Sequence, residues 1–290
     1  MNLNPKYKGI LLIMLSAFCF AWMNVCVRMS GDLPTLQKSF FRNLIAAGVA
    51  TAMLVRQGGS FRPASRGNLP LLLARGICGT VGILGNYYAV DHLVLSDATM
   101  LNKMSPFFAV LASALLLKEK LAPIQIAALA GAFGGALCII KPTFSNLNLL
   151  ASLVGFAGGV CSGLAYTVVR ILGRREEKGS YIVFFFSTFS CLVALPYVLF
   201  AGVPMTMEQI LWLIGAGATA AGGQFAITAA YCCAPAREIS VFDYSQVIFS
   251  AVIGFFIFGD LPDGLSFLGY FIICAMALLN FWYNNHYKKP

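Results

Sequence analysis

Apolar residues run along this chain in stretches of about 20, and short segments with charge, glycine or proline separate one stretch from the next. A helix needs about 20 mainly apolar residues to cross the hydrocarbon core of a bilayer, so each stretch predicts one transmembrane helix. The predicted helices cover residues 8–27, 36–55, 69–90, 95–117, 121–140, 149–171, 181–200, 209–233, 237–258 and 264–283. The pattern therefore predicts an all-α integral membrane protein with ten transmembrane helices.

Composition supports a lipid environment. Hydrophobic residues make up 59% of the 290 positions and charged residues only 11%, against about 25% charged residues in an average soluble domain. A soluble enzyme, a disordered chain and a small disulfide scaffold are excluded, because a soluble protein this apolar would lack the polar surface that keeps it in solution. Ten helices with short loops leave no length for a separate soluble domain.

Lysine and arginine predict the orientation, because cytoplasmic segments of membrane proteins carry an excess of them. If the N-terminus is cytoplasmic, the inside segments hold 14 of the 20 basic residues, the outside segments hold 3, and 3 lie within predicted helices. We therefore expect both termini in the cytoplasm. The net charge of +9 fits basic loops beside anionic lipid, so we expect no nucleic-acid partner.

Metal and cofactor sites are not expected. The nine cysteines are scattered through apolar runs without a C-x-x-C pair, and cysteine packs well as a small hydrophobe. His92 and His286 are far apart in the sequence. No cleavable signal peptide is expected, because the first apolar run is long and lacks a small-residue cleavage pattern.

The two halves of the sequence resemble each other. A shift of 141 residues lays REISVFDYSQVIF (residues 237–249) on SDATMLNKMSPFF (residues 96–108), and near the start of each half a shift of 142 lays Arg170 on Arg28. Five predicted helices per half make the second half enter the membrane from the opposite side, which predicts an inverted-topology repeat. The expected units are residues 1–145 and 146–290. Chance similarity of apolar helices is the alternative, against which the aligned polar positions argue.

These segments resemble a known family. The stretches FFRN (40–43), SDAT (96–99), SPFF (105–108) and LLKEKL (116–121) are similar to those of EamA-type carriers in the drug/metabolite transporter superfamily. The family's turn between its fourth and fifth helices usually reads Gly-Glu, whereas this chain has Lys118-Glu119 and Gly259-Asp260. The resemblance implies two five-helix repeats and transport of a small organic molecule such as an amino acid, S-adenosylmethionine, a nucleotide or a sugar phosphate.

Lys103 and Asp243 are the strongest candidates for a substrate site. A charge within a membrane helix is costly and usually faces a wet cavity or a partner, and Lys103 lies about 12 Å along the predicted helix 95–117. The repeat lays Asp243 on Asn102 and Tyr244 on Lys103. Lys103 would hold a carboxylate or phosphate, and Asp243 an amine or a proton. The alternative is a direct Lys103–Asp243 salt bridge that only fixes the packing.

Further polar and aromatic residues could complete a mainly apolar pocket. The additional substrate-binding candidates are Trp22, Asn24, Tyr88, Tyr166 and Gln224, and Asn86 and Tyr87 lie next to Tyr88. An interfacial aromatic belt is the alternative for the tyrosines and Trp22.

Several other residues have two interpretations. Arg42 and Arg75 lie in predicted helices and either face the pathway or anchor at the interface. Pro106 would kink its helix beside Lys103 or act as a hinge. The coupling and gating candidates are Asp243, Arg42 and Pro106. At helix ends, Asp97 and Glu238 are expected to cap helices or to gate, and Arg28 and Arg170 to be helix-end charges.

Among function classes, a secondary transporter with alternating access fits the repeat and the deep charges. No Walker motif is present, so ATP is not expected as the energy source. An intramembrane enzyme would need motifs such as G-x-S-x-G or H-E-x-x-H, which are absent. A channel would be expected to show rings of like residues from an oligomer, whereas the repeat suits a pathway within one chain.

The favoured function is transport of an amino acid or amino-acid-like zwitterion around a midplane cavity. The alternative substrates are an organic anion, a nucleotide or an S-adenosylmethionine-like metabolite. A proton is a candidate coupling ion, the chain is expected to be a monomer or weak homodimer, and a bacterial inner membrane is the expected location.

Overall fold

The computed structural model describes residues 5–58, 61–117, 122–140, 148–233 and 240–286, and in these ranges it contains helices and no strand. The α-helices are α1 (Pro5–Met29), α2 (Thr35–Arg56), α3 (Leu69–His92), α4 (Leu95–Asn102), α5 (Ser105–Leu117), α6 (Pro123–Ile140), α7 (Leu149–Arg174), α8 (Gly179–Ala201), α9 (Met207–Cys233), α11 (Ser245–Phe258) and α12 (Gly264–His286). Two 3₁₀ helices, η1 (Arg66–Asn68) and η2 (Ser240–Tyr244), precede α3 and α11. The all-α prediction is confirmed.

Two of the predicted helices are wrong as continuous elements. The predicted helix 95–117 is broken between α4 and α5, with Lys103 as the C-cap of α4. Pro106 is the second residue of α5, where its missing N–H costs no helical hydrogen bond, and its ring disfavours helical conformation in the preceding residue. The predicted helix 237–258 begins, within the described residues, as the 3₁₀ helix η2 and becomes α-helical only at Ser245.

Among the described residues, six helices are long and apolar enough to cross a membrane, by length and composition: they lie in α1, α3, α7, α8, α9 and α12. The α2 helix is not among them because it carries several polar residues, and α4, α5 and α11 are short because of the breaks. Many large apolar side chains on these helices are exposed, for example Leu11, Leu192 and Phe271, as lipid-facing residues are. The number of spans stays a prediction.

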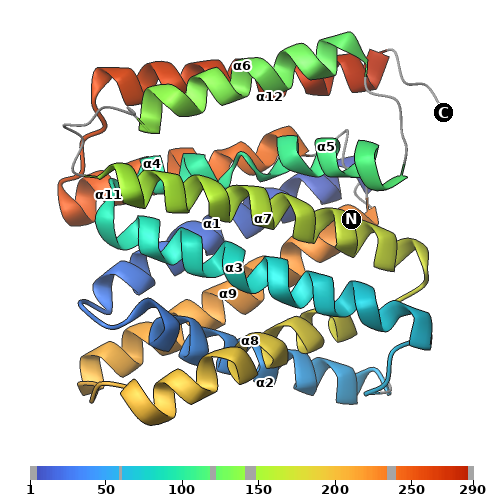
Figure 1. The fold of residues 1–290 in the computed structure, drawn as a ribbon, viewed down its shortest axis with the longest axis vertical. Helices are drawn as coiled ribbons and strands as arrows, with labels where there is room; N and C mark the ends of the chain where they lie inside the picture. Colours follow the sequence, from blue (N-terminus) through green and yellow to red (C-terminus); the bar gives the residue numbers. More distant parts are fainter. Residues whose placement is uncertain (1–4, 59–60, 118–121, 141–147, 234–239, 287–290) are drawn as a thin grey trace.

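The helices lie side by side and run across the longest dimension of the molecule (Figure 1). Along that dimension α6 packs on α12 at one end and α2 packs on α8 at the other, while α1 packs on α9 and α3 on α7 between them. Each of these pairs joins a helix from the first half of the chain to one from the second half. The middle of the molecule is therefore built jointly by both halves.

Glycines of α7 let it approach the break between α4 and α5. A Cβ atom on Gly159 would lie 2.5 Å from the Leu101 carbonyl oxygen, and one on Gly163 would lie 2.5 Å from the Ser105 carbonyl oxygen. Real Cβ atoms do not come this close to backbone, so larger side chains would push α7 away. The small residues on this face of α7 thus allow close packing against the broken segment.

Candidate functional site

A cavity lies between α1, α2, α3, α4, α7, α8, α9 and α11, near the middle of most of them. The empty space within it, including the part open to solvent, is about 630 Å³. The lining residues are Phe20, Met23, Arg42, Arg75, Gly79, Gly82, Ile83, Asn86, Tyr87, Asn102, Lys103, Ser162, Ala165, Tyr166, Phe186, Gln224 and Gln246. The lining is a mixture of apolar, amide and cationic side chains.

Lys103 lies at the helix break and borders the cavity. Its Nζ atom donates to Asp243 Oδ2 at 2.6 Å, and the two side chains are 6% and 9% exposed. The Tyr244 hydroxyl donates to the Lys103 carbonyl oxygen at 3.0 Å, which helps hold the end of α4. Asp243 Oδ1 has no hydrogen-bond partner among the described residues. The break thus places a buried ion pair, with one carboxylate oxygen to spare, beside the cavity.

Arg75 of α3 is 4% exposed and lies over the Phe186 ring, with its Cζ atom 3.9 Å from the ring centroid. Its Nε and Nη1 atoms have no hydrogen-bond partner among the described residues. A Cβ atom on Gly79 would overlap Arg75 Nη1, so the glycine leaves the space that the guanidinium occupies. Arg75 is therefore a buried cation with free donors beside an apolar wall.

Arg42 of α2 is also 4% exposed. Its Nη1 atom donates to Asn43 Oδ1 at 2.6 Å, while Nε has no partner among the described residues. The nearby Tyr87 side chain is fully buried, and its hydroxyl likewise lacks a partner in the described chain. Tyr87 lines the cavity, as do Arg42 and Arg75. Because both arginines are buried in the cavity wall, the interpretation that they anchor at the membrane interface is wrong.

Buried polar atoms without partners concentrate around this cavity. Within the described residues they belong to Arg42, Arg75, Tyr87, Ser187, Asp243 and Ser245. Three of these residues line the cavity, Asp243 contacts the lining residue Lys103, and Ser187 and Ser245 are neighbours in sequence of Phe186 and Gln246. Native proteins satisfy nearly all buried polar groups, so such a concentration marks a place prepared for a ligand.

The structure brings most predicted site residues together. Five of them line the cavity: Asn102, Lys103, Tyr166, Gln224 and Arg42. Asp243 and Tyr244 contact Lys103 from η2. Asn24 is fully buried behind the lining, where its Oδ1 accepts a hydrogen bond from Asn86 at 3.1 Å.

Three predicted site residues lie elsewhere. Trp22 packs on the apolar core with its ring edge-on to Phe18 at 6.4 Å. Tyr88 stacks on His92 at 4.3 Å. Pro106, the predicted hinge, begins α5 immediately after the break and does not line the cavity.

Sequence reasoning missed part of the lining. Arg75 was recognisable as a charge in a predicted helix, but its depth in that helix did not show whether its side chain faces a cavity or the membrane interface. Gln246, the second residue of α11 and 5% exposed, was visible only as an amide in an apolar run. Phe186 and Gly79 carry no signal in the sequence, because their roles come from α8 and α3 packing around Arg75.

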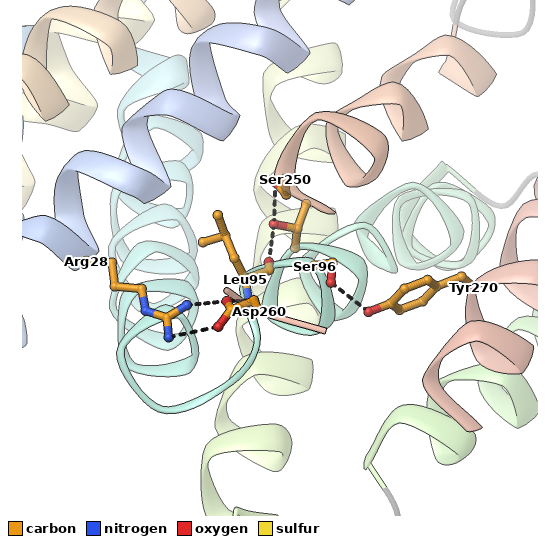
Figure 2. Close-up of polar contacts among 7 residues, drawn as sticks. Arg28, Leu95, Ser96, Ser250, Asp260 and Tyr270 are labelled. Carbon is orange, nitrogen blue, oxygen red and sulfur yellow. Dashed lines mark hydrogen bonds and ion pairs between the residues drawn. The ribbon is translucent and has the colours of Figure 1, made fainter. Parts of the chain in front are cut away.

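A second polar group, the helix-end cluster, lies where α1 and α11 end and α4 begins (Figure 2). It consists of Arg28, Leu95, Ser96, Asp97, Thr99, Ser250, Asp260 and Tyr270. Arg28 forms an ion pair with Asp260, whose Oδ2 atom also accepts from the Leu95 amide at 3.1 Å. The ion pair with Asp260 neutralises the charge of Arg28 at the end of α1, where the sequence predicted a helix-end charge.

Asp97 lies in the first turn of α4, where a carboxylate suits the positive N-terminus of a helix. The α4 helix begins without a side-chain cap, and Asp97 Oδ1 accepts a hydrogen bond from the Tyr270 hydroxyl at 2.6 Å. Glu238, its predicted counterpart, and the Lys118-Glu119 turn lie outside the described residues.

A further buried ion pair was not predicted. Lys38 of α2 is 1% exposed, and its Nζ atom donates to Asp91 Oδ1 at 2.7 Å. Neither residue lines the cavity. The pair joins the start of α2 to the end of α3 and serves as a structural counterpart to Lys103–Asp243.

Known proteins resemble this chain over nearly its whole length. The pseudopaline exporter CntI of Pseudomonas aeruginosa is 34% identical over 281 residues, which cover 96% of this chain and 97% of the exporter. A riboflavin transporter of Brucella anthropi is 27% identical, covering 84% of this chain and 88% of that protein. A solved crystal structure matches the fold with a TM-score of 0.66 at 18% identity, covering 97% and 98% of the two chains.

The family model of the EamA-like transporters matches residues 7–141. This match, the full-length similarity to named transporters and the apolar helices identify a multi-pass membrane protein that transports a small metabolite. The chain belongs to the EamA-like transporter family, within the drug/metabolite transporter superfamily.

Proposed function

We propose that this protein is a secondary active transporter that moves an amino acid or amino-acid-like zwitterion by alternating access around the central cavity. The single observation that supports it best is the buried Lys103–Asp243 pair at the helix break, with Lys103 on the cavity wall. An amino acid presents a carboxylate and an amine on one carbon, and this pair presents a cation and an anion 2.6 Å apart.

The Lys103–Asp243 ion pair is suited to replacement of its internal contact by contacts with a zwitterionic substrate. Removing two charges from water costs several kcal/mol each, and their mutual attraction offsets this only with good geometry. A zwitterion that enters would give its carboxylate to Lys103 and its amine to Asp243, so that each buried charge keeps a partner. Asp243 Oδ1, which has no partner among the described residues, is available to the amine. The same carboxylate is our candidate for proton coupling, with Arg42 and Pro106 as gating candidates.

The inverted repeat remains part of this proposal, with units at residues 1–145 and 146–290. Its support is the pattern of contacts: α1 packs on α9 as α7 packs on α3, and each broken segment touches the first helix of the other half. Residues at the offset of 142 also recur in the cavity wall, as Phe20 with Ser162 and Met23 with Ala165. Rocking of two such halves would open the cavity to each side in turn.

An organic anion, a nucleotide or an S-adenosylmethionine-like metabolite is the second candidate class. The observation that favours it is the cationic wall formed by Arg42, Arg75 and Lys103. Relatives named for pseudopaline and riboflavin show that similar chains are named for quite different molecules. We further propose a monomer or weak homodimer in a bacterial inner membrane, with both termini in the cytoplasm.

The test is ligand-dependent thermal stabilisation of the purified protein in detergent, beside uptake by proteoliposomes. A ligand that binds only the folded state raises the stability by mass action. We compare wild type with the double variant Lys103→Gln/Asp243→Asn, which removes both charges together and leaves no unpaired charge. The matched control is Lys38→Gln/Asp91→Asn, which neutralises the other buried pair away from the cavity.

We expect neutral amino acids to stabilise wild type and the control. At a ligand concentration near the wild-type Kd, a tenfold loss of affinity in the Lys103/Asp243 double variant should remove about 85% of this stabilisation. If the double variant binds as well as wild type, the pair only fixes the packing. If anions without an amine stabilise wild type and amino acids do not, the second class of substrate replaces the first.

A further inference from the structure

The cavity holds more positive charge than one amino-acid backbone can balance. Its described lining contains three cations, Arg42, Arg75 and Lys103, and no aspartate or glutamate. Asp243 balances Lys103 from just behind the wall. The guanidinium groups of Arg42 and Arg75 repel each other, since each is within electrostatic reach of the other. Two buried cations are therefore left without a counter-charge from the described chain.

The protein holds Arg75 in a fixed place although nothing bonds its Nε and Nη1 atoms among the described residues. The Phe186 ring supports one face of the guanidinium, an arrangement that stabilises a desolvated cation. Gly79 leaves room for Nη1 where any Cβ atom would overlap it. A supported cation with free donors is suited to binding an oxyanion, since guanidinium groups form paired, charge-assisted hydrogen bonds with carboxylate and phosphate.

Arg42 and Tyr87 extend this arrangement. Arg42 Nε and the Tyr87 hydroxyl are buried donors without a partner in the described chain, and both side chains line the cavity. The charge of Arg42 acts on Tyr87 as well as on Arg75. Donors of α2 and α3 therefore come together in the wall of the cavity, within electrostatic reach of one another.

We propose that Arg42 and Arg75 form a second, anion-binding subsite, which takes an acidic group that the substrate carries in addition to its amino-acid moiety. The substrate class is thus an amino acid with a further carboxylate or phosphate, and Tyr87 donates to the same oxyanion. This inference rests on the proposed function for the Lys103–Asp243 pair and adds the chemistry that distinguishes the substrate from a neutral amino acid.

The experiment compares probes of nearly equal shape and different charge. The full chain in detergent is titrated with L-glutamate against L-glutamine and with O-phospho-L-serine against L-serine, and the concentration at half-maximal thermal stabilisation is measured. We expect the acidic member of at least one pair to stabilise wild type at a concentration at least about tenfold lower than its neutral partner, because hydrogen bonds to charged groups contribute this much. The pair that shows the difference tells carboxylate from phosphate.

Variants then place the effect on the two arginines. Arg42→Gln and Arg75→Gln are expected to raise the half-maximal concentration for the acidic probe about tenfold or more and to leave that of the neutral probe within about threefold. Gly79→Ala leaves both charges in place but displaces Arg75, and is expected to act in the same direction. Gly134→Ala in α6, where a Cβ atom meets nothing within 4 Å, is the matched control and should bind like wild type.

The outcomes separate this inference from the proposed function. If acidic and neutral probes stabilise wild type equally, or if the arginine variants keep the preference for the acid, the subsite is overturned while the amino-acid site survives. If succinate, which has no amine, matches glutamate and loses its effect in the arginine variants, the subsite stands and the amine site fails. If none of the four amino-acid probes stabilises wild type, both are overturned.

Discussion

Arg28 and Arg75 are both stacked on a phenylalanine ring, Arg28 at 4.3 Å from the Phe258 centroid and Arg75 at 3.9 Å from the Phe186 centroid. The half-buried Arg28 has a carboxylate partner, Asp260, which also bonds the Leu95 amide. Arg75 is 4% exposed, yet two of its nitrogens have no partner in the described chain. Selection for stability alone would give the counter-ion to the more buried cation. This comparison distinguishes the helix-end cluster, where an ion pair joins helices, from the cavity, where a buried arginine has no counter-ion in the described chain.

The largest effect is expected from breaking the helix-end cluster. Asp260→Ala removes the partner of Arg28 and the acceptor of the Leu95 amide at the start of α4. The free energy of unfolding, measured by titrating the purified protein with a denaturing detergent, should fall by about 2–3 kcal/mol. Asp263→Ala, which removes the acceptor of the Ser266 amide near the start of α12, is the control and should cost about 1 kcal/mol. Equal losses in the two variants would contradict a role of Asp260 in joining helices.

A smaller effect compares the same chemical change in both regions. Tyr270→Phe removes the hydroxyl that lies 2.6 Å from Asp97 Oδ1 and 2.9 Å from Ser96 Oγ, and should lower the free energy of unfolding by about 1 kcal/mol. Tyr87→Phe removes a hydroxyl with no partner among the described residues, and should lower it by less than about 0.3 kcal/mol. If Tyr87→Phe proves the more destabilising of the two, Tyr87 has a structural role.

A third effect has the opposite sign. Arg75→Gln, measured without ligand in the same denaturation assay, should raise the free energy of unfolding by about 0.5 kcal/mol, because it removes a buried charge that nothing in the described chain balances. Stacking on Phe186 partly offsets the gain. A clear loss of stability in this variant would mean that Arg75 is needed for packing in the empty protein.

Much of the fold could be predicted from the sequence, because lipid imposes strong constraints. Every described α-helix lies on one of the apolar runs, and α2 and α3 begin and end within two residues of the predicted bounds. Breaks at Lys103 and before Ser245 could not be predicted from apolarity, since the runs continue through them. The sequence signal for the first break was Pro106, because a proline ring disfavours helical conformation in the residue before it.

The candidate site could be predicted only in part. Lys103 and Asp243 stood out because a charge in an apolar run is rare, and the repeat offset brought them together. The roles of Trp22 and Tyr88 could not be settled, because an aromatic residue serves equally in a pocket, a core or an interface. Nothing in the sequence distinguished the paired Arg28 from the unpaired Arg75, since their partners come from distant segments.

The sequence by itself determined the solvent, the helical class and the residues whose charge is costly in a membrane, because these depend on local composition and spacing. Only the tertiary structure decided which of those charges are neutralised. Packing of α3 and α8 around Gly79 places Arg75 on the Phe186 ring, with no ion-pair partner among the described residues, whereas the end of α11 brings Asp260 to Arg28. The distinction matters physically because an ion pair depends on distances of a few ångströms between residues far apart in the chain.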